Sequence, residues 1–186
     1  MNRKLFKGGL VAVPLAFSIL SCSRSATDVA IKWTNDIKAK VLEDASRTPD
    51  KTVYDSAHRM LTTFKDGKKL KECYFAKREN HDETQPPVYD TGMIVWYSAD
   101  QNFQFIRMPC TPRTDRTFEG VAYKGNRYGF AEYQYCKKAI RETGFIFNNF
   151  NVGTWTQYDS AGQVVEAKDV GDAEKLRSVE DIHYSR

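Results

Sequence analysis

The chain of 186 residues carries 28 Lys and Arg against 24 Asp and Glu, and 41% of its residues are hydrophobic. This composition excludes a disordered tail, a collagen-like repeat and a disulfide-dense mini-protein, and the length is that of one domain. Residues 1–21 hold three basic residues and no acidic one, so the remainder carries 25 positive and 24 negative groups. A nucleic-acid-binding domain keeps a basic surplus on its folded part, and we therefore expect no nucleic-acid partner.

The first 21 residues have the layout of a secretory signal. Three basic side chains precede an apolar run at 10–20, which is shorter than the roughly 20 residues of a membrane-spanning helix. The run ends in Ile19-Leu20-Ser21-Cys22, which resembles the lipobox of bacterial lipoproteins. The resemblance implies cleavage between Ser21 and Cys22 and lipid attachment to Cys22, so that residues 1–21 are a signal peptide and residues 22–26 a lipidated tether.

Ser23 follows the expected lipidation site, at a position where some bacterial lipoproteins carry an aspartate that retains them in the inner membrane. By that family logic we expect an anchor in the outer membrane. We take the domain to face the periplasm, while the sequence itself leaves the periplasmic and the outer face open. The bilayer is then a partner of this protein through the N-terminal lipid.

A helical pattern opens the domain expected at 27–186. Thr27 or Asp28 can cap the helix, and residues 46–49 end it. Apolar residues recur there at spacings of three and four, which places them on one side of a helix that packs on a sheet: Ala30, Trp33, Ile37 and Val41.

Short alternating segments rich in aromatic and β-branched residues follow, which is typical of strands. Asp66-Gly67 supplies the positive φ angles of a tight turn, so residues 60–75 are expected to form a β-hairpin. We expect a second hairpin from 93–97 and 103–108, a third run of strands over 119–168, and loops at 78–87 and 109–116.

These strands repeat. The phrase Tyr-Asp-Ser-Ala occurs at 54–57 and 158–161, with Tyr97-Ser98-Ala99 as a third version and a weaker copy from Tyr135. The last two tyrosines lie 23 residues apart, and residues 123–129 match 147–153 if one inserted residue is allowed. Such a period indicates units of strand, turn and strand that bury their apolar faces on their neighbours.

Residues 153–162 read Gly-Thr-Trp-Thr-Gln-Tyr-Asp-Ser-Ala-Gly, which resembles the Gly-x-Trp-x-x-Tyr-Asp-x-x-Gly phrase of MORN-type repeats and, more closely, its variant in YwqK-family antitoxins. The resemblance covers 118–169 well and 52–108 loosely. It implies an antiparallel meander of MORN-like hairpins. With the N-terminal helical pattern and a short one near the C-terminus, we expect a mainly β (α+β) fold with a helix on each side of the meander. We expect Asp172 to cap that last helix, with Leu176, Val179 and Ile182 along one side, covering the end of the sheet.

Three cysteines remain besides Cys22: Cys73, Cys110 and Cys136. In an oxidising compartment one pair can form, with all three pairings open; the alternative is that all three thiols are buried and reduced. Cys136 followed by His183 also has the order of cell-wall peptidases resembling NlpC/P60, which implies a thiolate nucleophile and its base. The context of Cys136 departs from that family's Asp-Cys-Ser phrase, and we expect a protein that is not an enzyme.

Three widely spaced histidines, His58, His81 and His183, match no zinc-site spacing, and we expect neither a metal nor a cofactor. The leading hypothesis is an envelope protein that binds another protein, most concretely an immunity or antitoxin protein that captures a toxin. The alternative is a structural or assembly lipoprotein that scaffolds an envelope complex. Because arginine and aromatic residues dominate protein-binding hot spots, the expected binding residues are Arg107, Arg113, Arg116, Trp155 and Tyr158.

Overall fold

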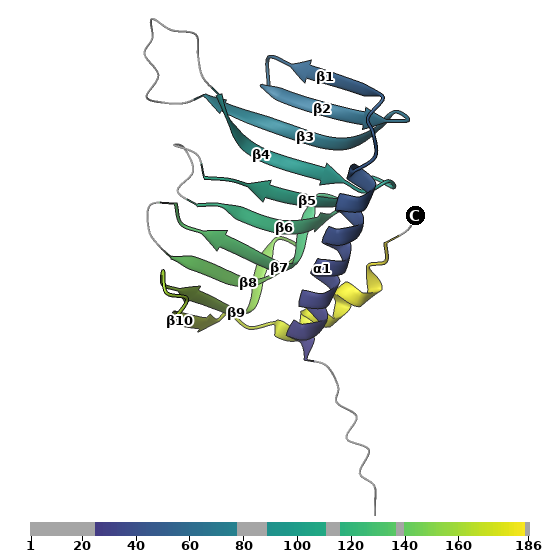
Figure 1. The fold of residues 1–186 in the computed structure, drawn as a ribbon. Coiled ribbons are helices and arrows are strands. Elements are labelled where there is room, and N and C mark those ends of the chain that lie inside the picture. Colours follow the sequence, from purple (N-terminus) through teal and green to yellow (C-terminus); the bar gives the residue numbers. More distant parts are fainter. Residues whose placement is uncertain (1–24, 78–88, 111–115, 137–139, 185–186) are drawn as a thin grey trace, which may run out of the picture.

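The computed structural model describes residues 25–77, 89–110, 116–136 and 140–184 (Figure 1). The expected signal peptide, the lipidation site Cys22 and the candidate binding residue Arg113 lie outside the described residues. So do most of the two loops expected at 78–87 and 109–116. Within the described ranges, no helix has the length and apolar character needed to cross a membrane.

In the described ranges, one helix and ten strands are followed by a 3-10 helix: α1 (Ala26–Ala45), β1 (Lys51–Asp55), β2 (Met60–Lys65), β3 (Lys68–Lys77), β4 (Tyr89–Tyr97), β5 (Phe103–Met108), β6 (Phe118–Tyr123), β7 (Asn126–Gln134), β8 (Arg141–Phe147), β9 (Phe150–Tyr158), β10 (Val164–Asp169) and η1 (Ala173–Asp181). The strands form one open sheet in the order of the chain, and every neighbouring pair is antiparallel. The expected mainly β meander with a helix at each end is confirmed.

Helix α1 lies across one face of the sheet (Figure 1). Its buried side comprises the predicted apolar positions together with Ala26, Val29 and Thr34. The expected cap at Thr27 or Asp28 is wrong, because the Ser25 hydroxyl already accepts the Asp28 N–H at 3.1 Å and the helix begins at Ala26. The helix ends at Ala45 with Ser46 as its C-cap, in agreement with the predicted end at 46–49.

Three hairpins turn through pairs of residues with positive φ. Asp66 and Gly67 join β2 to β3, as predicted, Lys124 and Gly125 join β6 to β7, and the pair at 148–149 joins β8 to β9. Two successive positive φ angles define the turn whose twist matches that of the flanking strands. Local sequence thus determines where the meander reverses.

The β6–β7 and β8–β9 hairpins repeat each other in detail. Gly129 and Gly153, 24 residues apart, have φ angles of 81° and 63°, and each lies at a break in strand register. The spacing equals the expected period of 23 plus the one inserted residue. Glycine is needed at both positions because L side chains rarely adopt such angles, and at Gly129 a Cβ would also meet the Thr34 hydroxyl at 2.1 Å.

Two hydrophobic clusters lie on opposite faces of the sheet, as strand alternation requires. The first, between the sheet and both helices, includes Trp33, Phe103, Phe145 and Leu176. The second, on the face away from α1, consists of Phe118, Ala131, Tyr133, Ile146 and Trp155. The sheet is therefore apolar on both faces over its central strands.

The C-terminal segment differs from expectation in two respects. Asp172 precedes η1, but its side chain makes no capping hydrogen bond and pairs instead with Lys175 at 2.9 Å. Leu176 and Val179 are fully buried as predicted, yet η1 packs against α1 and β9 instead of covering edge strand β10, all of whose residues are exposed. The predicted cover over the end of the sheet is thus wrong.

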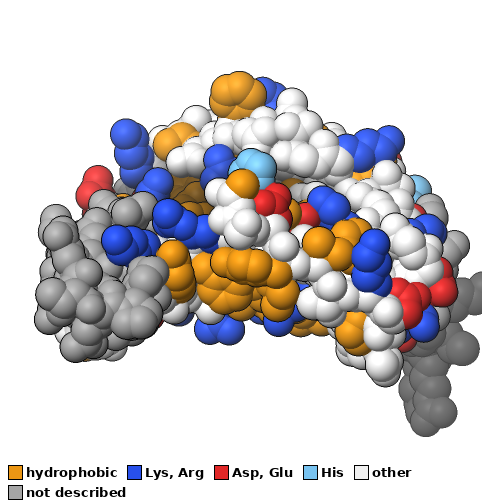
Figure 2. Space-filling model, turned by 90° about the horizontal axis from the view of Figure 1, so that it is seen from above, with side chains coloured by type: hydrophobic (Ala, Val, Ile, Leu, Met, Phe, Trp, Pro, Cys, Tyr) orange, Lys and Arg blue, Asp and Glu red, His pale blue; other side chains and the backbone are white. Residues whose placement is uncertain are grey.

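The other edge of the sheet is exposed as well. Val53 and Tyr54 of β1 are 40% and 55% exposed, and seen from the β1 side the molecule shows hydrophobic side chains interspersed with Lys and Arg (Figure 2). The sheet thus has two open edges, at β1 and at β10.

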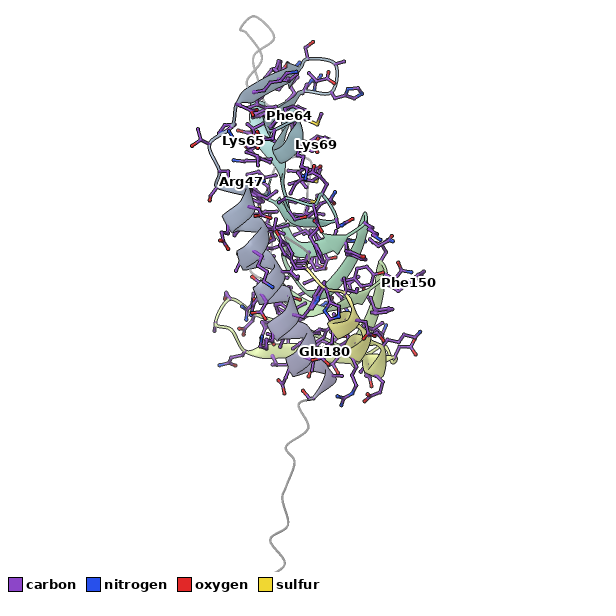
Figure 3. The ribbon with its side chains drawn as sticks, turned by 90° about the vertical axis from the view of Figure 1, so that its right-hand side faces the viewer. Arg47, Phe64, Lys65, Lys69, Phe150 and Glu180 are labelled. Atoms are coloured by element: carbon purple, nitrogen blue, oxygen red, sulfur yellow. A yellow bond between two sulfur atoms is a disulfide. The ribbon has the colours of Figure 1, made fainter. Side chains whose placement is uncertain are left out.

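One large hydrophobic side chain away from both edges is also exposed. A side view places Phe150, at the start of β9, at the surface (Figure 3), where it is 72% exposed.

Candidate functional site

The structure separates the predicted binding residues between the two faces of the sheet. Arg107 and Tyr158 belong to the face that α1 partly covers. Arg107 is on the same side of β5 as the core residues Phe103 and Phe105, and Tyr158 lies opposite Arg141 on the neighbouring strand. Trp155 is 94% buried in the second cluster. These residues therefore do not form one site.

Arg116 belongs with Trp155. Its guanidinium lies 4.7 Å from the centre of the Tyr133 ring, and that ring lies 5.8 Å from the Trp155 ring. Both side chains thus hold the second cluster together, and Trp155 is too deeply buried to meet a partner directly.

The basic residues of the first hairpin also make contacts within the molecule. Lys69 pairs with Glu72 at 2.6 Å, Lys68 donates to the carbonyl of Ala99 at 2.9 Å, and Lys71 lies over the Trp96 ring. Part of the positive charge of this hairpin is therefore used to hold β3 to β4 and to the β4–β5 turn.

A row of charges crosses the sheet beside α1. We call it the charged row and define it as Arg107 of β5, Glu119 of β6, Glu132 of β7 and Arg141 of β8. Arg107 lies 4.0 Å from Glu119, and Arg141 lies 3.7 Å from Glu132. The side chains are between 39% and 63% exposed, so the row is open to solvent and to a partner.

Two like charges meet at the centre of the row. Glu119 and Glu132 stand directly opposite each other on β6 and β7, an arrangement that destabilises a sheet unless cations compensate it. Arg107 and Arg141 do so from either side, and Lys38 of α1 adds an ion pair to Glu119. The helix thereby holds one of the two central carboxylates of the row.

A hollow of about 210 Å³ adjoins the charged row and is lined in part by Arg107, Glu119, Glu132 and Gln134. A second one of about 530 Å³ shares Gln134 and is lined by Arg141 and the turn at 159–162. Together they extend the row toward the strand ends.

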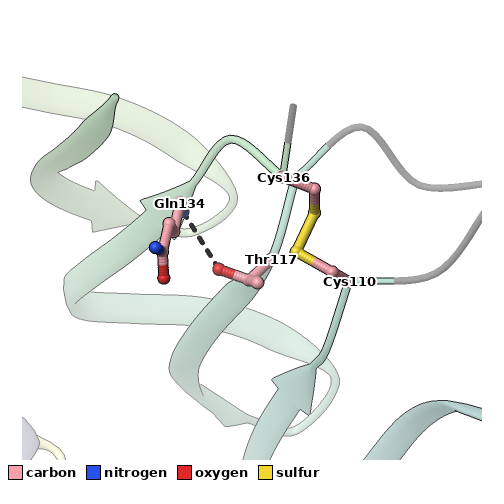
Figure 4. Close-up of a disulfide and its surroundings, with 4 residues drawn as sticks. All are labelled: Cys110, Thr117, Gln134 and Cys136. Atoms are coloured by element: carbon pink, nitrogen blue, oxygen red, sulfur yellow. Dashed lines mark hydrogen bonds between the residues drawn. A yellow bond between two sulfur atoms is a disulfide. The ribbon is translucent and has the colours of Figure 1, made fainter. Parts of the chain in front are cut away.

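A disulfide between Cys110 and Cys136 closes this end of the sheet (Figure 4). Beside it, the Gln134 N–H donates to the Thr117 hydroxyl at 3.0 Å. Of the three pairings left open by the sequence the structure has this one, and Cys73 is free. The pairing removes the thiol that the alternative with Cys136 as nucleophile and His183 as base requires.

The sequence patterns did not predict Glu119, Glu132 and Arg141 as members of one charge pattern, because residues from four strands become neighbours only through the register of the sheet. Among the described residues, no group of three or more His, Cys, Asp or Glu is placed to hold a metal ion.

No protein-family model, no curated protein and no solved structure matches this chain.

Proposed function

We propose that this protein is a non-enzymatic binding module of the cell envelope, anchored by lipid, that captures a protein partner through the charged row. The observation that supports this most directly is an ordered set of exposed charges on the part of the sheet beside α1. Charges of both signs in a fixed order favour one partner orientation and disfavour others.

The chemistry of the row defines the partner. Arg107 and Arg141 present guanidinium groups suited to carboxylates, while Glu119 and Glu132 between them accept from basic side chains. The adjoining hollow of about 210 Å³ offers room for one side chain of the partner, the usual setting of a binding hot spot. The complementary surface is therefore basic at its centre and acidic on both sides.

The most concrete partner is a toxin, with this protein acting as its immunity or antitoxin protein. This part of the proposal rests on the resemblance of residues 153–162 to the repeat phrase of YwqK-family antitoxins and on the lipobox that ends at Cys22. Both are features of the sequence, and they point to capture at the envelope.

The test uses the full-length chain with a C-terminal tag, solubilised in detergent and mixed with envelope and secreted fractions. We expect one stoichiometric protein to co-purify, and its toxicity to disappear on mixing. Replacing Arg107 and Arg141 together by Glu is expected to weaken capture by about tenfold or more, because two charged contacts become repulsive.

Lys175→Glu is the matched control, because it reverses an exposed charge on η1, away from the row, and is expected to leave capture unchanged. Equal capture by the double variant and the native chain would exclude the charged row as the binding surface. Co-purification of several envelope-complex subunits would instead support the scaffold alternative.

A further inference from the structure

The outer side of β10 carries unused backbone hydrogen-bonding groups. Val170 N–H donates to the Gly153 carbonyl at 2.9 Å, and the register places Lys168 opposite Trp155 and Glu166 opposite Gln157. Because antiparallel bonding alternates along a strand, Lys168 and Glu166 bond to β9, and the N–H and C=O of Ala167 point away from the sheet.

The side chains of β10 leave this edge accessible. Every residue from Val164 to Asp169 is exposed, and Val164 and Val165 are 61% and 62% exposed. Within the described part of the chain, η1 packs against α1 and β9. An edge strand of this kind is a template for pairing with another strand.

The sequence of β10 is complementary to itself. If two copies pair antiparallel with Ala167 opposite Ala167 of the second copy, Glu166 faces Lys168 and Lys168 faces Glu166. Opposite charges directly across an antiparallel pair stabilise it, and like charges destabilise it. Neither side chain has an ion pair within the described residues, so both are available.

The other edge is less suited to this pairing. A symmetric pair of β1 strands centred on Val53 would set Lys51 opposite Asp55 of the second copy. Asp55, however, already accepts the backbone N–H groups of Ala57 and His58 and lies 2.7 Å from the His58 ring. Its carboxylate is committed to the turn that follows β1.

We infer that two copies of this protein associate through β10, antiparallel and two-fold symmetric about Ala167, so that the two sheets become continuous. At the axis the two Ala167 residues exchange N–H···O=C bonds, and two Glu166–Lys168 pairs flank them. This interface is separate from the charged row, so it holds or fails independently of the proposed capture function.

Cysteine cross-linking tests the register. In full-length chains carrying Cys73→Ser, Ala167→Cys is expected to form an intermolecular disulfide under mild oxidation, because directly bonded antiparallel residues have Cα atoms about 5.5 Å apart. Val165→Cys is the matched control. In the inferred pairing, residue 165 of one copy lies four residues along the strand from residue 165 of the other, about 13 Å away. We therefore expect this variant to run as a monomer on a non-reducing gel.

Charge exchange tests the chemistry. Glu166→Lys or Lys168→Glu alone is expected to weaken association by about tenfold in sedimentation of the detergent-solubilised chain and to remove the Ala167→Cys cross-link. The double exchange restores both pairs and is expected to restore both signals. Equal cross-linking at 165 and 167, no cross-link at 167, or no rescue by the double exchange would overturn the inference.

Discussion

Gly144 of β8 lies directly against the indole ring of Trp155 in β9. A Cβ atom on Gly144 would stand 2.2 Å from Trp155 Cδ2, which is far inside van der Waals contact. The missing side chain is what lets the large ring lie flat on the sheet and become buried on the face opposite α1.

We therefore expect Gly144→Ala to reduce the free energy of unfolding by about 1–3 kcal/mol, because Trp155 must leave its place. Urea denaturation monitored by tryptophan fluorescence measures this. Gly92→Ala is the control, since the nearest atom there would lie 3.5 Å from the new Cβ; an equal loss at both sites would show that steric contact with Trp155 is not the cause.

Glu72 is a carboxylate that is only 2% exposed. It accepts hydrogen bonds from the hydroxyls of Tyr97 and Tyr74 and pairs with Lys69. Burial raises the pKa of this carboxyl, but Lys69 and the two hydroxyls lower it by more, so the pKa lies below its ordinary value. Burial and the neighbouring carboxylate raise the pKa of Tyr97 in turn.

Because the pKa of Glu72 is lower in the folded chain than in the unfolded chain, its ionised carboxylate stabilises the fold at pH values above the unfolded-state pKa. This stabilisation is lost as the pH falls through the folded-state pKa. We expect the native chain to lose stability below about pH 4. Glu72→Gln is expected to be less stable by about 1–3 kcal/mol at pH 6 and to lose less on acidification. Urea denaturation at pH 3 and pH 6 measures both; parallel losses in the two proteins would contradict this role.

Among the elements, η1 and the residues after it hold α1 on the sheet. Trp33 Nε1 of α1 donates to the Ile182 carbonyl at 3.1 Å, and the Tyr184 hydroxyl donates to Asp44. The Tyr184 ring stacks on Phe103 at 5.2 Å. The last residues of the chain thus bind the first helix.

Leu176→Ala is expected to reduce the free energy of unfolding by about 2–5 kcal/mol, because this fully buried side chain fills the space between α1 and the sheet. Chemical denaturation measures the loss. Lys175→Ala, an exposed neighbour, is expected to change stability by less than about 0.5 kcal/mol, and a similar loss from both variants would contradict the packing role of Leu176.

The disulfide is the second link between elements. Cys110 follows β5 and Cys136 follows β7, and the two positions are separated by 26 in the sequence. We expect replacement of both cysteines by Ser to cost about 3 kcal/mol, mainly through the freedom that the unfolded chain regains. Cys73→Ser is the control with an unchanged disulfide, and identical stability of the native and doubly substituted proteins would show that the link is unimportant.

Across the whole molecule, the most deeply buried strand residues lie where α1 covers the sheet. Phe103 and Val121 of β5 and β6 are at most 1% exposed, while Val53 of β1 is 40% exposed. Protection of backbone amides follows local burial and packing, so stability is expected to decline from the middle of the sheet toward its edges.

Hydrogen exchange on the Glu166→Lys variant, in which the inferred dimer is disrupted, is expected to be slowest in β5–β7 and fastest in β1 and β10. Each strand serves as a control for the others within one experiment. Uniform protection from β1 to β10 would show instead that the ten strands unfold as one cooperative unit.

Much of the fold could be predicted because its signals are local. The apolar spacing of α1 and the Asp66-Gly67 turn act within a few residues, and the predicted hairpins are present. The predicted cap at Thr27 or Asp28 was wrong because Ser25, just before them in the chain, makes the cap. The site could be predicted only in part: Arg107 is in the charged row, whereas Trp155 turned out to be core.

Local sequence signals are enough to specify the helix, the strand turns and the repeat of the β6–β7 and β8–β9 hairpins, since backbone preferences and periodicity act over short distances. Three other features arise from the folded arrangement: Cys110 pairs with Cys136, Glu72 is buried, and Arg107 and Trp155 face opposite ways. These depend on strand register and on the face that α1 covers, which bring together residues far apart in the chain.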